Sequence, residues 1–337
     1  AQEIKPNLMS VVPRLLEKVF NKVNAKGSEL TGIKRALFFW AIKLGERYEP
    51  YQANGFWYEF QLKIARKLIF SKWKAAFGGE LHTMVSGSAA LHPRLARIFC
   101  ASGMMIMEGY GLTETSPVVS VGMHADHHFK IGTVGKPISN VEVKIAEDGE
   151  ILIKGPNVMK GYFKDPDKTA EVMSGDYFHT GDKGEIDPDG FIKITGRKKE
   201  MFKTSGGKYI IPTLIENDLK ESNFIEQVMV IGENQKMPAA LIQLNFEFIQ
   251  EWIERKKIDL EPTPEAICAS DIIIERIQKE VSKSNQGFGK WEQIKRFELT
   301  PDVWCIEGGH LTPTMKMKRS VIYDLYKDLV SKIYTDV

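Results

Sequence analysis

The chain has 337 residues, of which 43% are hydrophobic and 27% charged, so it is long enough to bury the cores of about two domains. Its 46 Lys and Arg residues against 44 Asp and Glu leave a net charge of +2, which gives no support for a nucleic-acid partner. No apolar run approaches the roughly 20 residues that span a bilayer. The three cysteines lack disulfide or zinc spacing, which favours a reducing, cytoplasmic location.

Residues 1–80 are basic, with 14 Lys and Arg against 7 Glu. Apolar residues repeat at helical spacing from Val11 to Val23, and a second amphipathic helix is expected over Glu59–Phe77. Two interpretations stay open. In the first, they are solvated core helices. In the second, they form a face that contacts a protein partner or a membrane surface, such as the inner face of the membrane.

Residues 81–125 predict part of a parallel sheet. Leu81–Val85 and Met104–Met107 read as buried strands, with a helix over Pro93–Ser102 between them. Ligands of such sheets bind where the strands end. The segment after Met107 is therefore the first place to look for a site.

The later segments predict different architecture. Alternating strands at Val141–Ile145 and Ile151–Lys154, and again at Glu185–Ile186 and Phe191–Ile194, predict antiparallel hairpins in a barrel-like subdomain. Helices and a further hairpin then suggest a separate α+β domain. The expected division is a partial α/β subdomain over 1–125, the barrel-like subdomain over 126–198 and a C-terminal α+β domain over 199–337.

The string from Gly109 to Ser116 has the composition of a nucleotide site. Gly109 and Gly111 permit close backbone approach, and Tyr110 can stack on a base. The hydroxyl of Thr113 can donate to phosphate, and the carboxylate of Glu114 can hold Mg²⁺. The alternative is a structural turn with a buried tyrosine.

Taken with its surroundings, this string resembles the adenylate-forming superfamily, which includes acyl-CoA synthetases, luciferases and peptide-synthetase adenylation domains. Further stretches resemble that family's motifs in the same order along the chain. They are the small-residue loop Ser86–Ala90, the ribose motif Tyr177–Asp182, the pair Gly196-Arg197, the loop Ser205–Ile210 and the C-terminal element Leu311–Arg319.

The resemblance implies a large α/β domain with a smaller α+β domain, and a reaction that uses ATP, Mg²⁺ and CoA. The implied catalytic residues are Lys316, Thr113 and Glu114, with Glu114 also the metal ligand and Lys199 the hinge. The implied nucleotide-binding residues are Gly87, Ser88, Ala89, Gly109, Tyr110, Gly111, Thr113, Asp182 and Arg197. The implied CoA-binding residues are Ser205, Gly206 and Gly207.

The opening Ile4–Arg14 and the Pro-Thr-Met form of the element before Lys316 resemble the long-chain fatty acid–CoA ligases. The family's Gly/Ser/Thr-rich phosphate loop has no counterpart here, so the chain resembles the C-terminal part of such an enzyme. Two alternatives stay open. One is transfer of the acyl group to a carrier protein or activation of another acid, and the other is a non-catalytic nucleotide- or acyl-binding fragment. The oligomeric state is not indicated.

Overall fold

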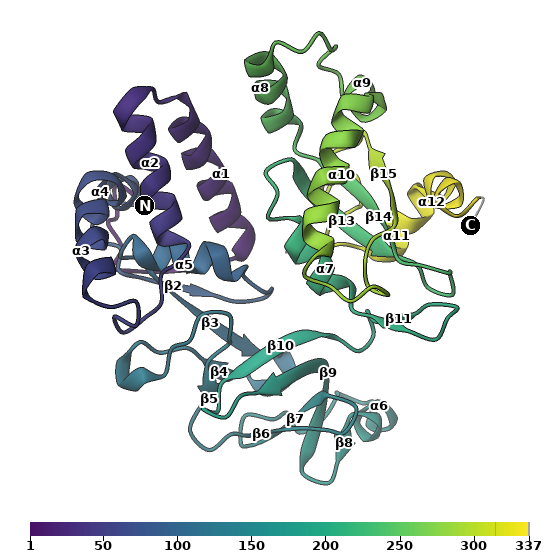
Figure 1. The fold of residues 1–337 in the computed structure, drawn as a ribbon. Coiled ribbons are helices and arrows are strands. Elements are labelled where there is room, and N and C mark those ends of the chain that lie inside the picture. The colour runs from purple at the N-terminus through teal and green to yellow at the C-terminus, as the bar shows by residue number, and fades with distance from the viewer. Residues whose placement is uncertain (314, 336–337) are drawn as a thin grey trace. The chain divides into compact units, whose positions relative to one another are not determined.

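A computed structural model describes residues 1–313 and 315–335. The chain divides into two compact units, Ala1–Thr195 and Gly196–Val337, which are called the first and the second unit below. Each unit is described by itself (Figure 1). The predicted domain bounds 1–125, 126–198 and 199–337 stay predictions.

The first unit begins with a helical layer packed on a sheet. A large core cluster joins the helices to that sheet, and Phe70, Phe99 and Leu16 are among its fully buried members. The predicted helix Glu59–Phe77 is divided into three, because a π-helical turn interrupts it. The elements are α1 (Pro13–Glu29), α2 (Gly32–Gly45), α3 (Phe56–Ala65), the π-helix η1 (Arg66–Phe70), α4 (Ser71–Ala76) and α5 (Pro93–Ala101).

The first sheet has the order β1-β2-β3-β4-β5. Its parallel part is β1 (Leu8–Val11), β2 (Thr83–Ser86) and β3 (Met105–Gly111), which agrees with the predicted strand–helix–strand unit. The antiparallel strands β4 (Val118–Val121) and β5 (Lys136–Pro137) extend it. The prediction that the strand ends at Met107 was wrong, because pairing with β4 keeps the chain extended to Gly111.

The second sheet of the first unit is antiparallel, with the order β10-β9-β7-β6 and the short β8 paired to β9. Ile151, Ile153 and Ile192 of this sheet pack with Val119 of β4 in a separate core cluster. The predicted hairpins are confirmed. The elements are β6 (Glu142–Ile145), β7 (Glu150–Lys154), α6 (Pro166–Glu171), β8 (Met173–Ser174), β9 (Tyr177–Ile186) and β10 (Ile192–Arg197), preceded by the 3-10 helices η2 (Thr113–Thr115) and η3 (Ala125–His127).

The second unit has a three-stranded sheet of order β13-β14-β15 with a hydrophobic cluster on each side. Alternate residues of β13 enter the two clusters, Val228 and Val230 one of them and Met229 and Ile231 the other, as strand geometry requires. The elements are β11 (Phe202–Lys203), β12 (Tyr209–Ile210), α7 (Pro212–Leu219), β13 (Ile225–Ile231), β14 (Ala239–Leu244), α8 (Phe246–Lys256), α9 (Pro264–Ala269), α10 (Asp271–Asn285), β15 (Arg296–Thr300), α11 (Arg319–Leu325) and α12 (Lys327–Tyr334). The predicted fold class, α/β followed by α+β, is confirmed.

Candidate functional site

The turn that follows β3 is built by its glycine and threonine residues. A Cβ atom on Gly111 would lie 1.7 Å from the carbonyl oxygen of Pro117, so no larger residue fits without a backbone shift. The buried hydroxyl of Thr115 accepts from the Leu112 amide at 2.9 Å and lies 2.9 Å from the Pro117 carbonyl oxygen, to which it can donate. The close approach expected at Gly111 is therefore an approach of the chain to itself.

Tyr110 and Asp182 come together although they are far apart in sequence. The Tyr110 hydroxyl donates to Oδ2 of Asp182 at 2.8 Å, and the Asp182 carboxylate is only 3% exposed. Two residues that the motifs separately assign to nucleotide binding therefore share one hydrogen bond. Their roles toward a ligand stay predictions.

The backbone around Asp182 is held by polar groups of β7 and β9. The Thr180 hydroxyl donates to the Ile151 carbonyl at 2.8 Å and accepts from the Asp182 amide at 3.0 Å. The buried carboxylate of Glu150 accepts from the Gly181 amide at 2.8 Å and lies 3.1 Å from Nδ1 of His179. No sequence motif pointed to Glu150, which looks like an ordinary hairpin residue until the strands pair.

Glu114 lies in η2, immediately after β3, with a half-exposed side chain. Its Oε1 accepts from the Tyr162 hydroxyl at 3.0 Å, and its carbonyl oxygen accepts from the Met159 amide at 2.8 Å. Burial, and then the bond to Glu114, raise the pKa of Tyr162. Tyr162 therefore orients the carboxylate, and no sequence motif pointed to it.

The donor set around Glu114 suits one kind of metal site. Among the described residues, no group of three or more His, Cys, Asp and Glu side chains could hold a metal by itself. Mg²⁺ is commonly held by one or two carboxylates together with substrate phosphates and water. A single oriented carboxylate beside a nucleotide motif fits that pattern.

The small-residue loop between β2 and α5 lies beside β3. A Cβ atom on Gly87 would lie 3.8 Å from the Gly109 carbonyl oxygen, which places the loop next to the glycine string. Ser88 and Ala89 are exposed, and Ser88 has a positive φ of 70°. At the far end of the loop, the Leu91 amide donates to Oε2 of Glu108 at 3.3 Å.

Glu108 is the least expected member of this region. Burial raises the pKa of its carboxyl to about 7, only partly opposed by the hydrogen bond from Leu91. The residue pairs with Ser86 across β2 and β3, next to the motif glycines. An acidic side chain at this position was not singled out from the sequence.

In the second unit, Lys316 lies on a tight hairpin. The Thr312 amide donates to the Lys316 carbonyl at 2.8 Å, and the Lys316 amide donates back to the Thr312 hydroxyl at 3.0 Å. Leu311 and Met317 form a β-bridge that closes the hairpin. The Lys316 side chain is exposed, so its backbone is fixed while its ammonium stays in solvent.

Arg319 is more buried than the neighbouring Lys316 and Lys318. Its two guanidinium nitrogens contact Oε1 and Oε2 of Glu216 at 2.7 and 2.6 Å. Glu216 is 2% exposed, and its Oε1 also accepts from the Val230 amide at 2.8 Å. The pair anchors the start of α11 to α7 and β13.

The other predicted residues of the second unit lie on exposed segments. Arg197 ends β10, and Lys199 follows in a turn. Ser205, Gly206 and Gly207 form the turn between β11 and β12, in which Gly207 has a φ of +79° and its amide donates to the Thr204 carbonyl at 2.9 Å. A Cβ atom on Gly206 would meet nothing closer than 4.0 Å.

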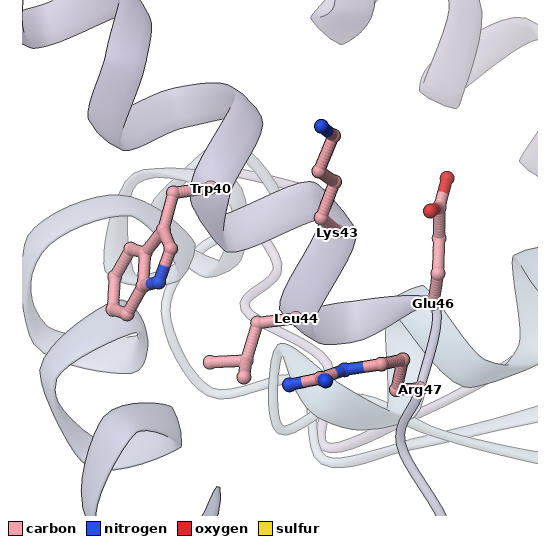
Figure 2. A pocket seen from close by; sticks show the side chains of 5 residues that line it. All are labelled: Trp40, Lys43, Leu44, Glu46 and Arg47. Atoms are coloured by element: carbon pink, nitrogen blue, oxygen red, sulfur yellow. The ribbon is translucent and has the colours of Figure 1, made fainter.

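A cavity of about 380 Å³ lies at the C-terminal end of α2, apart from the motif residues (Figure 2). Oε1 of Glu46, one of its lining residues, is held by Arg94 at 2.8 Å, and the guanidinium of Arg47 lies 6.0 Å from the centre of the Tyr58 ring of α3. None of the predicted site residues lines it. The lining residues are Trp40, Lys43, Leu44, Glu46 and Arg47.

Comparison with known families agrees with this geometry. Residues 1–163 match the AMP-binding enzymes, and residues 200–337 match the C-terminal domain of AMP-binding enzymes. The chain belongs to this family. The AMP-binding match contains the Gly109 string, Glu114 and Tyr162, and the C-terminal match contains Lys316 and the Glu216–Arg319 pair.

Among the relatives of this AMP-binding chain, the long-chain-fatty-acid–CoA ligase FadD15 of Mycobacterium tuberculosis is 34% identical over 332 residues, which cover 98% of this chain and 55% of that protein. The human long-chain-fatty-acid–CoA ligase 1 is 32% identical over 353 residues, covering 99% of this chain and 49% of that protein. The chain therefore spans about half the length of these curated relatives.

Solved structures support the fold. The adenylation domain of a carboxylate reductase from Mycobacterium chelonae superposes with a TM-score of 0.69 at 20% identity, covering 99% of this chain and 47% of that one. The adenylation and carrier didomain of a carboxylic acid reductase from Segniliparus rugosus gives a TM-score of 0.69 at 21% identity, covering 99% and 42%. At these identities the likeness concerns the fold.

Proposed function

We propose that this chain is the C-terminal part of an AMP-forming long-chain fatty acid–CoA ligase. The observation that carries the proposal is the 34% identity to such a ligase along 332 residues, which are 98% of this chain. The contact of Tyr110 with Asp182 supports it, because two motif residues separated in sequence meet in one site.

The reaction has two steps. A fatty-acid carboxylate attacks the α-phosphate of ATP, giving acyl-AMP and pyrophosphate, and the thiol of CoA then displaces AMP to form the thioester. Negative charge builds on the phosphate oxygens and the leaving pyrophosphate in the first step, so positioning and electrostatics supply most of the catalysis. The proposal assigns charge stabilisation to the ammonium of Lys316 and hydrogen-bond donation to the hydroxyl of Thr113.

The remaining residues have binding roles in this proposal. Asp182 and Arg197 hold the ribose, and the backbone of Gly109–Gly111 with the loop Gly87–Ala89 lies along the nucleotide and the acyl group. The exposed turn Ser205–Gly207 lines the path of CoA, where the open space around Gly206 allows close approach. Lys199 is the hinge at which the chain turns between the two steps of the reaction.

Glu114 would hold Mg²⁺, with Tyr162 orienting the carboxylate. When bound, the ion would neutralise charge on the phosphates of ATP. The other ligands in this arrangement are substrate phosphate oxygens and water, which agrees with the single carboxylate found among the described residues of this turn.

The test is fatty-acid-dependent exchange between ATP and pyrophosphate with palmitate and Mg²⁺, measured on the protein encoded by the complete reading frame that contains this chain. Exchange that requires palmitate supports the ligase. No exchange with palmitate or any other acid overturns adenylation and favours a nucleotide-binding protein without catalysis. Comparing CoA with a holo-carrier protein as acceptor then separates a CoA ligase from a carrier-protein ligase.

Lys316→Ala in the same protein tests the catalytic assignment, with Lys318→Ala as the matched control on the same exposed hairpin. We expect Lys316→Ala to lower acyl-AMP formation by about 10²–10³-fold while thioester formation from supplied palmitoyl-AMP is kept. The control should retain both half-reactions. Equal loss of the two half-reactions in Lys316→Ala, or equal loss of exchange in the two variants, would contradict the role.

The proposal includes a peripheral contact with the cytoplasmic face of a membrane, because long-chain fatty acids partition into bilayers. No helix among the described residues combines the length and apolar character needed to cross a membrane. One surface of the first unit suits such a contact.

A further inference from the structure

The helical segment α3–η1 carries an apolar stripe on its solvent side. Its opposite side packs into the core through Tyr58, Leu62 and Ala65. Five large apolar side chains are exposed to solvent at positions that share one helix face. They are Phe56 (86% exposed), Trp57 (68%), Phe60 (47%), Ile64 (38%) and Leu68 (45%).

Contacts on the exposed side and on the buried side of α3 hold this apolar stripe in place. The rings of Trp57 and Phe60 stack with centroids 5.6 Å apart and an angle of 20° between their planes, so each exposed ring restrains the other. On the buried side, the Tyr58 hydroxyl donates to the Leu44 carbonyl at 2.8 Å, which fixes α3 against α2. The apolar face is therefore a feature of a well-packed helix, shown among the purple elements of the first unit in Figure 1.

Basic residues border this stripe. From residue 56 to residue 77 the sequence has five Lys and Arg and a single acid, Glu59. Lys63 and Lys67 are exposed and lie one helical turn apart beside Phe60 and Ile64. The neighbouring helix α2 brings further cationic groups to its own C-terminal end (Figure 2).

We propose that this stripe, Phe56–Leu68 with its flanking lysines, docks on an anionic lipid bilayer. The aromatic and aliphatic side chains would enter the boundary between headgroups and acyl chains, while the ammonium groups of Lys63 and Lys67 stay at the level of the lipid phosphates. A protein partner fits less well, because lysine is depleted in protein–protein interfaces. A helix face that mixes basic and aromatic residues is typical of helices that lie on a membrane surface. The inference rests on the peripheral contact in the proposed function.

Binding to vesicles tests this inference without any substrate, so its failure is distinguishable from failure of the ligase proposal. The chain is sedimented with vesicles of phosphatidylcholine alone and of phosphatidylcholine mixed with phosphatidylglycerol. We expect binding to the anionic vesicles that weakens as salt is raised. Lys63→Gln together with Lys67→Gln should weaken it by about 30-fold, at about 1 kcal/mol for each lysine.

Matched controls isolate the surface. Lys279→Gln with Lys283→Gln removes the same charge at the same helical spacing from exposed positions of α10 in the second unit, and it should leave binding within about twofold of the parent. For the apolar part, Phe60→Ala should weaken binding by about tenfold, because the ring no longer enters the interface. Phe163→Ala, at an 89% exposed ring elsewhere, should not.

A direct readout comes from quenching of tryptophan fluorescence by brominated lipid. We expect quenching in the parent and its loss in Trp57→Phe, while that conservative variant still sediments with vesicles. Three results would overturn the proposal. The first is that the chain does not bind anionic vesicles. The second is that the double lysine variant and Phe60→Ala bind as well as their controls. The third is that the protein of the complete reading frame shows neither binding nor Trp57 quenching, which would mean that another part of that protein covers the stripe.

Discussion

Replacing Glu108 by Gln should change how the stability of the first unit depends on pH. The Glu108 carboxyl is buried beside the glycine string, and burial raises its pKa from 4.5 to about 7. The glutamine has nearly the same shape, and its amide oxygen can still accept the hydrogen bond that the Leu91 amide donates at 3.3 Å. The substitution therefore removes the ionisation and keeps the contact.

The direction follows from proton binding in the folded and unfolded chains. Below pH 4.5 Glu108 is protonated in both states, so its ionisation costs nothing. Between pH 4.5 and about 7 the unfolded chain releases its proton while the folded chain keeps it, which favours unfolding as the pH rises. Above about pH 7 the cost stays constant at about 3 kcal/mol, the free energy that corresponds to the difference between the two pKa values.

The assay is urea denaturation of the parent and of Glu108→Gln at a series of pH values, followed by circular dichroism. The difference in free energy of unfolding between the two proteins cancels the titration of all other groups. We expect this difference to grow in favour of the glutamine variant between pH 4.5 and 7 and then to level off.

A flat difference for Glu108→Gln over the same range would refute the reasoning, because it would mean that the buried carboxyl titrates as it does in the unfolded chain. A difference that falls with rising pH would refute it more strongly, since ionised Glu108 would then stabilise the fold. The transition of the first unit is the relevant one, because Glu108 lies in that unit.

Two further substitutions test the local geometry. Gly111→Ala should destabilise the first unit by about 3 kcal/mol or more, because its Cβ would lie 1.7 Å from a backbone carbonyl oxygen, whereas Gly206→Ala should stay within about 0.5 kcal/mol. Thermal melts of both variants check this, and equal melting temperatures would contradict the close approach. Arg319→Gln should cost about 3–5 kcal/mol because it leaves the carboxylate of Glu216 buried without its partner, and the exposed Lys318→Gln should cost little. Urea unfolding of the second unit measures both, and a loss below about 1 kcal/mol for Arg319→Gln would show that the pair contributes little.

Local patterns predicted much of the fold. The hairpins at Val141–Lys154 and Glu185–Ile194 follow from alternation and turn residues, which act over a few neighbouring positions. The parallel strands and the helix Pro93–Ala101 follow in the same way. The end of β3 could not be predicted locally, because its last residues are held extended by pairing with β4.

The candidate site shows the same limit more clearly. The motif residues were predicted because each stands in a short recognisable string, but the residues that contact them were not. Tyr162 reaches Glu114 across 48 positions, Glu150 reaches Gly181 across 31, and Arg319 contacts its partner across 103. Each of these contacts depends on the completed fold, so a single sequence carries no signal that pairs them.

The position of Lys316 illustrates how such hidden contacts serve a visible motif. Three residues after it, Arg319 is fixed by the buried carboxylate of Glu216, and the Lys318 amide donates to the His310 carbonyl at 2.9 Å. The backbone on the C-terminal side of the lysine is therefore tied to the core of the second unit, while its ammonium stays exposed. In the proposed role of Lys316 this combination is useful, because a fixed backbone limits the search for a phosphate to the side-chain rotamers of the lysine.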